Sequence, residues 1–113
     1  MKNKINYTSQ SRRDMDDIWA YIAVELQNQD SAEKTLNRIM DTVDQLEIFA
    51  ESGEIVTAFA EVYREERFLV SGKYLIFYHV LEKDIFIDRV LYGGRDYLKI
   101  LFEDALHPEE NES

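Results

Sequence analysis

The sequence predicts an α+β domain. An N-terminal strand and an antiparallel two-helix hairpin are expected to pack on a twisted antiparallel sheet, followed by a short C-terminal helix. Apolar residues recur at helical spacing in two segments of the first half. β-Branched and aromatic residues dominate three segments of the second half. The gaps between neighbouring segments are short, which favours antiparallel hairpins.

The chain is expected to begin with a short strand and a first helix. Ile5 and Tyr7 alternate with polar residues, which is typical of a strand. Ser11 and Asp14 have the spacing of a capping box, so the helix is expected to start there. One apolar face follows and is expected to be buried; it consists of Met15, Ile18, Trp19, Ile22, Ala23 and Leu26.

A second helix is predicted after a break of a few residues at 28–30. Asp30 or Ser31 is expected to cap it, with Glu33 placed to complete a capping box from Asp30. Because the break is short, the two helices should form an antiparallel hairpin. The apolar face of the second helix consists of Ala32, Leu36, Ile39, Met40, Val43 and Leu46.

The second half predicts an antiparallel three-stranded meander and a closing helix. Ser71-Gly72 separates the first two strands, and residues 82–84 separate the last two. Gly93-Gly94 ends the sheet, and apolar residues between 97 and 102 indicate a short helix. We expect one domain over residues 1–105 and an acidic, flexible tail over 106–113. The three strands are predicted at 62–70, 73–81 and 85–92.

Burial determines how these elements should be layered. The helical hairpin is expected to cover one face of the sheet, which leaves the other face open to solvent or to a partner. If Lys83 and Asp84 form the loop between the last two strands, Tyr78 lies opposite Arg89 and His79 opposite Asp88.

Composition limits the classes of function. A chain of 113 residues without cysteine has neither disulfides nor cysteine-based metal sites. No apolar run is long enough to cross a membrane, and the N-terminus does not have the pattern of a signal peptide. Together these features fit a cytoplasmic protein. There is no glycine-rich phosphate loop and no histidine pair at metal-binding spacing, so we expect no cofactor and no metal.

The net charge of −10 is unevenly distributed. Residues 1–61 hold 6 basic and 12 acidic residues, and residues 100–113 hold 5 acidic residues and no basic one. Residues 62–99 are nearly balanced and contain four of the seven arginines. A nucleic-acid-binding domain is usually basic, so only a local patch in this middle segment could contact phosphate.

Arg89 is the most informative single residue, because it interrupts an apolar strand. It either stacks on Tyr78 at a solvated face or is held on the strand to meet phosphate or an acidic partner. His79 beside Asp88 is either a proton shuttle or, as we favour, a solvated polar pair. The acids around Asp14 are expected to favour the helix dipole rather than to bind a metal.

Further cations and tyrosines lie in and after the meander. Arg64 and Arg67 fall in the first predicted strand at opposite parity, so they cannot point to the same face. Arg95 follows the glycine pair, with Tyr97 two residues on. Arginines at strand ends with a nearby tyrosine suit phosphate contact and base stacking.

These segments, in this order, resemble the RelE/ParE toxins of type II toxin–antitoxin systems. The likeness covers residues 5–102. It includes "DMDDIWAYIA" at 14–23, "SAEKTLNRIMDTVDQL" at 31–46 and, most specifically, "YREERFLVSGKYLIFYHVLEKDIFIDRVLYGGRDYLKILF" at 63–102. The residues that fall on the family pattern are Arg64 or Arg67, Tyr74, Tyr78, Arg89, Arg95 and Asp96.

The resemblance implies a growth-inhibiting toxin of a plasmid stabilisation, or addiction, module, in a hetero-oligomer with its cognate antitoxin. ParE-like members act on DNA gyrase, and the acidic charge together with the "GGRDY" segment at 93–97 favours this branch. RelE-like members cleave messenger RNA on the ribosome; in that case the catalytic residues would be Arg64, Arg89, Arg95 and Tyr97. A third reading is a non-toxic module that only binds the antitoxin. Target or partner contacts are expected from Arg64, Arg67, Tyr74, Tyr78, Arg89, Arg95 and Tyr97.

Overall fold

A computed structural model describes residues 2–107 and contains one five-stranded sheet with strand order β1-β5-β4-β3-β2. The acidic, flexible tail was predicted to begin at residue 106. Leu106 instead belongs to the last helix, and residues 108–113 lie outside the described residues. In chain order the elements are β1 (Lys4–Tyr7), α1 (Ser9–Ala20), a π-helical turn η1 (Tyr21–Glu25), α2 (Gln29–Asp44), a 3-10 turn η2 (Gln45–Glu47), β2 (Glu54–Ile55), α3 (Thr57–Ala60), β3 (Arg67–Ser71), β4 (Tyr74–Leu81), β5 (Asp84–Tyr92) and α4 (Tyr97–Leu106).

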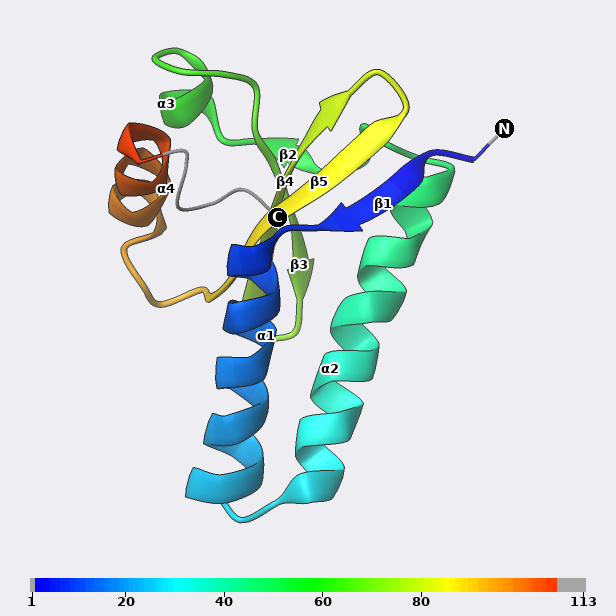
Figure 1. Ribbon diagram of the computed structural model, residues 1–113, viewed down its shortest axis with the longest axis vertical. Helices are drawn as coiled ribbons and strands as arrows, with labels where there is room; N and C mark the ends of the chain where they lie inside the picture. The colour runs from blue at the N-terminus through cyan, green and yellow to red at the C-terminus, as the bar shows by residue number, and fades with distance from the viewer. Residues whose placement is uncertain (1, 108–113) are drawn as a thin grey trace.

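The predicted α+β class is confirmed, with its N-terminal strand, helical hairpin, antiparallel meander and closing helix. Figure 1 shows α1 and α2 running beside each other and extending past the sheet. The first strand joins the sheet differently from the others, because β1 pairs in parallel with β5, with Ile5 opposite Ile85. The sheet is therefore mixed, with one parallel pair at its edge.

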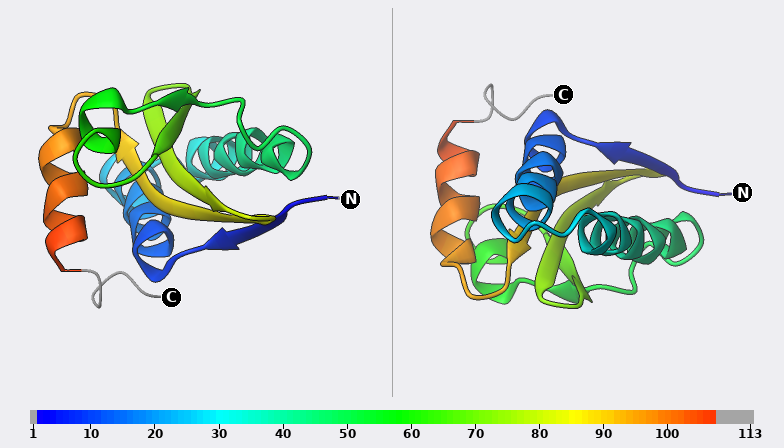
Figure 2. Two further views of the ribbon diagram at one scale, coloured as in Figure 1. Left: turned by 90° about the horizontal axis from the view of Figure 1, so that it is seen from above. Right: turned by 90° about the horizontal axis from the view of Figure 1, so that it is seen from below.

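Both faces of the sheet are covered, so the expectation of one open face is wrong. The hairpin face holds the larger apolar core, which joins α1 and α2 to strand residues such as Ile76, Tyr78 and Ile87. The other face holds a second core of Val56, Phe59, Phe77, Leu91 and Leu101. Figure 2 shows α3 and α4 beside each other, at the end of the molecule away from α2. The covering elements are α4, which was predicted, and α3, which was not.

The segment before β3 also differs from the prediction. The first meander strand starts at Arg67 rather than at 62, and Arg64 lies in the preceding loop. Val56 N donates a hydrogen bond to Glu66 O at 2.8 Å, and this bond closes residues 56–66 into a compact loop that contains α3. Phe59 packs this loop against α4, since its ring centroid lies 5.0 Å from that of Phe102. Val62 and Tyr63, which suggested a longer strand, are instead exposed residues that follow α3.

The register between β4 and β5 contains a bulge, and both predicted cross-strand pairs are wrong. The turn is Glu82-Lys83, with Glu82 at φ 58, so Leu81 pairs with Asp84. Phe77 lies opposite Arg89 while Tyr78 lies opposite Ile87, so Asp88 is the extra residue. A bulge shifts the register by one residue, and this change alters what Asp88 and Arg89 contact.

The helix starts lie upstream of the predicted caps. Thr8 caps α1 by accepting a hydrogen bond from Ser11 N at 3.1 Å, and Asn28 caps α2 by accepting one from Ser31 N at 3.0 Å. Trp19 was expected in the core but is 38% exposed, whereas Leu36 packs against the core as expected. The hairpin extends beyond the sheet (Figure 1), so the outer part of its apolar face has no strand to cover it.

Replacing Tyr78 by phenylalanine is expected to destabilise the protein by about 1–3 kcal/mol, since two buried backbone groups would lose their partner. The Tyr78 hydroxyl accepts from Gly53 N at 2.9 Å and donates to Ala50 O at 2.8 Å. Urea unfolding measures the change. The matched control is Tyr92→Phe, which removes an exposed hydroxyl and should shift stability by less than about 0.5 kcal/mol. Equal stability of the two variants would contradict the assigned role of the Tyr78 hydroxyl.

Candidate functional site

The sequence-predicted site residues fall into several different environments. Tyr74 and Arg95 line an open groove, whereas Tyr78 is fully buried in the core. Arg89 lies inside an ion-pair network, and Arg64 lies beside a cluster of buried acids. The four residues of the ribonuclease hypothesis, namely Arg64, Arg89, Arg95 and Tyr97, each contact a different set of neighbours.

The groove lies between the hairpin and the ends of β4 and β5 and has a volume of about 670 Å³. Its walls combine apolar side chains, three tyrosines and two cations. Only Tyr74 and Arg95 among these residues had been predicted as contacts from sequence, because α1 and η1 supply the opposite wall. The lining residues are Asp14, Asp17, Ile18, Tyr21, Ile22, Leu26, Lys73, Tyr74, Val90, Tyr92 and Arg95.

The glycine pair at the end of β5 brings the two cations to one end of the groove. Gly93 N donates to Lys73 O at 2.8 Å, and Arg95 N donates to Tyr92 O at 3.0 Å. A Cβ on Gly94 would lie 2.6 Å from the Tyr92 ring, so only glycine allows this close turn without moving that ring. Lys73 and Arg95 therefore lie together at one end of the groove, and they balance the charges of Asp14 and Asp17, which also line it.

The tyrosines of the groove are suited to binding rather than to proton transfer. The Tyr74 and Tyr92 rings meet edge to face with centroids 6.2 Å apart. Burial, followed by the proximity of Tyr21 and Tyr92, raises the pKa of Tyr74 above its usual value of 10.0. A phenol with a raised pKa stays protonated at neutral pH and does not act as a general base. The groove thus offers the protonated hydroxyl of Tyr74, aromatic surface, two cations and two carboxylates.

Arg89 is occupied by acidic residues of its own chain. Its Nε and Nη2 atoms donate to Asp14 at 2.7 and 2.8 Å, and Nη1 donates to Asp104 at 3.0 Å. Asp14 also accepts from Val90 N at 2.9 Å, at the part of β5 that β1 does not reach. The stacked and solvated position expected for Arg89 is wrong, since the residue is only 8% exposed. Asp14 is therefore part of this ion-pair network. The sequence had suggested only a favourable interaction of this acid with the helix dipole.

Arg67 and Tyr78 lie opposite each other on β3 and β4 and hold the loop that leads into β2. Arg67 donates to Gly53 O at 2.8 Å and to Glu51 O at 3.1 Å. A Cβ on Gly53 would lie 2.7 Å from the Tyr78 hydroxyl, so the loop packs tightly on that ring. Arg67 and Tyr78 therefore stabilise the conformation of this loop through hydrogen bonds to its backbone.

Tyr97 and Asp96 lie at the start of α4. The Tyr97 ring packs on Phe77 with centroids 5.3 Å apart, and it joins the second core. Asp96 caps the helix by accepting from Lys99 N at 3.3 Å. The "GRDY" segment therefore ends the sheet, starts α4 and leaves Arg95 exposed at the groove.

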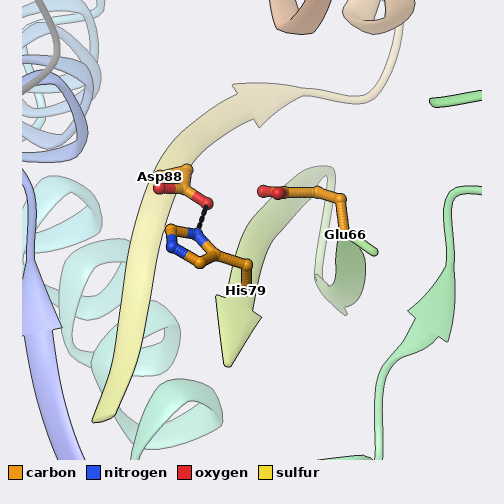
Figure 3. Close-up of side chains that lie close together, drawn as sticks. All are labelled: Glu66, His79 and Asp88. Atoms are coloured by element: carbon orange, nitrogen blue, oxygen red, sulfur yellow. Dashed lines mark hydrogen bonds and ion pairs between the residues drawn. The ribbon is translucent and has the colours of Figure 1, made fainter. Parts of the chain in front are cut away.

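Three ionisable side chains form a cluster on the α4 side of the sheet. His79 Nδ1 lies 2.6 Å from Asp88 Oδ2 (Figure 3). Glu66 Oε1 accepts a hydrogen bond from Arg64 Nε at 3.2 Å. Burial, followed by the charge of Asp88, raises the pKa of Glu66 to about 9. Burial also raises the pKa of Asp88 to about 6, and burial with the nearby Arg64 lowers the pKa of His79 to about 4. The sequence suggested the proximity of His79 and Asp88 but predicted a solvated pair; the structure makes it half-buried and adds Glu66.

No helix within residues 2–107 is long and apolar enough to cross a membrane.

The fold and the groove define a class of protein, namely a small α+β domain in which a helical hairpin and a mixed sheet form an open binding surface. A family model narrows this class. The model described as the ParE toxin of the type II toxin–antitoxin system parDE matches residues 5–97. The chain belongs to this ParE toxin family and is a type II toxin by family.

A solved structure described as the chromosomal ParDE TA system from P. aeruginosa has the same fold. The TM-score is 0.67 at 24% sequence identity, and the match covers 80% of this chain and 96% of that chain. Comparison with curated proteins gave no significant match. The RelE/ParE resemblance seen in the sequence is confirmed, with the ParE branch favoured.

Proposed function

We propose that the groove between the hairpin and the strand ends binds a segment of a cognate antitoxin and that this binding neutralises the toxin. The observation that carries the proposal is a groove with aromatic and apolar walls that holds Lys73 and Arg95 at one end and whose only other charged lining residues are Asp14 and Asp17. A peptide with acidic and apolar side chains matches such a surface in charge and in chemistry. Family membership supports the choice of an antitoxin as the partner.

The complex is a hetero-oligomer, and the pair works as an addiction module that stabilises a replicon in the cytoplasm. This part rests on the family alone. Co-expression with the product of the neighbouring gene tests it, using a tag on the antitoxin only. The toxin is expected to co-purify with the tagged antitoxin in a fixed ratio. Recovery of the antitoxin without the toxin would contradict the pairing.

We propose DNA gyrase as the cellular target. The support is partly electrostatic, because a net charge of −10 disfavours approach to the dense phosphate of a ribosome. It is also structural, since Arg89 is neutralised by Asp14 and Asp104, and the Tyr97 ring packs on Phe77 in the second core. A protein target tolerates a surface of mixed charge better than a nucleic acid does.

Induced expression in growing cells is expected to cause growth arrest with altered supercoiling of a reporter plasmid and with intact messages. Gel analysis of the plasmid and primer extension on translated messages give the two readouts. Cleavage at codon boundaries with normal supercoiling would instead indicate RelE-like ribonuclease activity. Normal growth at a verified toxin level would indicate a module that binds the antitoxin without toxicity.

A further inference from the structure

Three side chains that can ligate a metal converge from separate parts of the chain. Glu66 comes from the segment before β3, His79 from β4, and Asp88 from the bulge in β5. Each offers one ligand atom, and these atoms lie within 4.8 Å of one another. Figure 3 shows the Glu66 carboxylate pointing from its own segment toward the His79–Asp88 pair.

Glu66 supplies a second observation that is independent of this clustering. The residue is 1% exposed, and its Oε2 atom accepts no hydrogen bond from a described donor; the group that it faces is the carboxylate of Asp88, to which it can bond only through a shared proton. A buried carboxylate oxygen without a partner is costly, and the nearby carboxylate of Asp88 adds repulsion. A proton or a cation placed between the two carboxylates removes both costs.

We propose that Glu66, His79 and Asp88 bind one divalent transition-metal ion of the Zn²⁺ type. An imidazole nitrogen with two carboxylate oxygens is a ligand set that Zn²⁺ accepts, whereas Mg²⁺ and Ca²⁺ prefer oxygen ligands alone. Two carboxylates also match the charge of the ion. Bound there, the ion ties the segment before β3 to β4 and β5. The inference rests on this geometry and is independent of the proposed antitoxin and gyrase interactions.

Arg64 controls access to the cluster from the solvent side. Its guanidinium lies 3.2 Å from Glu66 Oε1 and 3.5 Å from Asp88 Oδ2, and 41% of its side chain is exposed. A bound cation would repel Arg64 into solvent, and the flexible, exposed side chain can move there. Arg64 and the metal thus compete for the same carboxylates, so Arg64→Ala is expected to tighten Zn²⁺ binding about tenfold.

The test is calorimetric titration of the tag-free full chain with Zn²⁺, together with thermal unfolding at about a hundredfold excess over Kd. We expect one ion per chain and a rise in Tm of about 10 °C. His79→Gln and Glu66→Gln are each expected to weaken binding at least about tenfold, since the loss of one ligand or its charge weakens a chelate. Glutamine replaces Glu66 without leaving a buried charge, so that variant should fold.

The matched control is His107→Gln, which removes the other histidine of the chain and lies outside the cluster. This variant is expected to bind Zn²⁺ like the parent chain. Equal Zn²⁺ affinity in His79→Gln and the parent would overturn the proposal. A parent chain without a Tm change at millimolar Zn²⁺ would also overturn it, and a proton alone would then satisfy the two carboxylates. Equally tight binding of Mg²⁺ would overturn the assignment to a transition metal.

Discussion

Replacement of Asp14 by alanine is expected to lower the free energy of unfolding by about 3–5 kcal/mol, because it leaves the buried cation of Arg89 without its main partner. Asp14 contacts Arg89 through two hydrogen bonds of 2.7 and 2.8 Å and also accepts from Val90 N. Asp104 alone cannot replace these contacts, since it is bonded to a single nitrogen of the guanidinium. Chemical denaturation followed by circular dichroism measures the change.

The matched control for this prediction is Asp17→Ala, which removes an exposed acid from the same helix. It should change stability by less than about 0.5 kcal/mol. The double variant Asp14→Leu with Arg89→Met is expected to be more stable than Asp14→Ala, because no unpaired buried cation remains. A loss below about 1 kcal/mol for Asp14→Ala would show that solvent reaches Arg89 and that the network contributes little.

The second large effect is expected in the groove, where Tyr74→Ala combined with Arg95→Glu should weaken antitoxin binding about 30- to 100-fold. An aromatic and an arginine side chain that contribute somewhat more than about 1 kcal/mol each to an interface together account for about 2–3 kcal/mol. Both side chains line the groove; Arg95 is exposed, whereas Tyr74 also packs against the edge of the larger core. Circular dichroism and thermal unfolding must therefore show that the variant is folded before affinities are compared. Interferometry with the purified antitoxin measures the affinity, and a growth assay shows whether the antitoxin still rescues cells.

Arg38→Glu serves as the charge-matched control, because Arg38 is exposed on α2 and does not line the groove. It makes the same change in net charge as Arg95→Glu, so any general electrostatic effect appears in both variants. Normal antitoxin affinity in the groove variant would place the antitoxin on another surface. A parallel loss of affinity in Arg38→Glu would indicate long-range charge rather than groove contact.

The candidate site was only partly predictable from sequence. Tyr74 and Arg95 were found, because they flank the strand and glycine signals that end the meander. Tyr21, on the opposite wall, belongs to a helical segment whose apolar pattern suggested only core packing. Glu66 was not predicted as a site residue, because no local signal in the sequence marks it as buried. A side chain joins such a site through the folding of distant segments, which local patterns do not encode.

The sequence by itself determined the first strand, the hairpin, the meander and the closing helix, because each of these segments carries the periodicity of its own burial. Only the tertiary structure decided the parallel pairing of β1 with β5, the bulge at Asp88 and the internal position of Arg89. These features depend on contacts between residues far apart in the chain, such as Asp14 with Arg89. A one-residue change in turn position or a single bulge changes every neighbour of a strand residue, and neither leaves a trace in local periodicity.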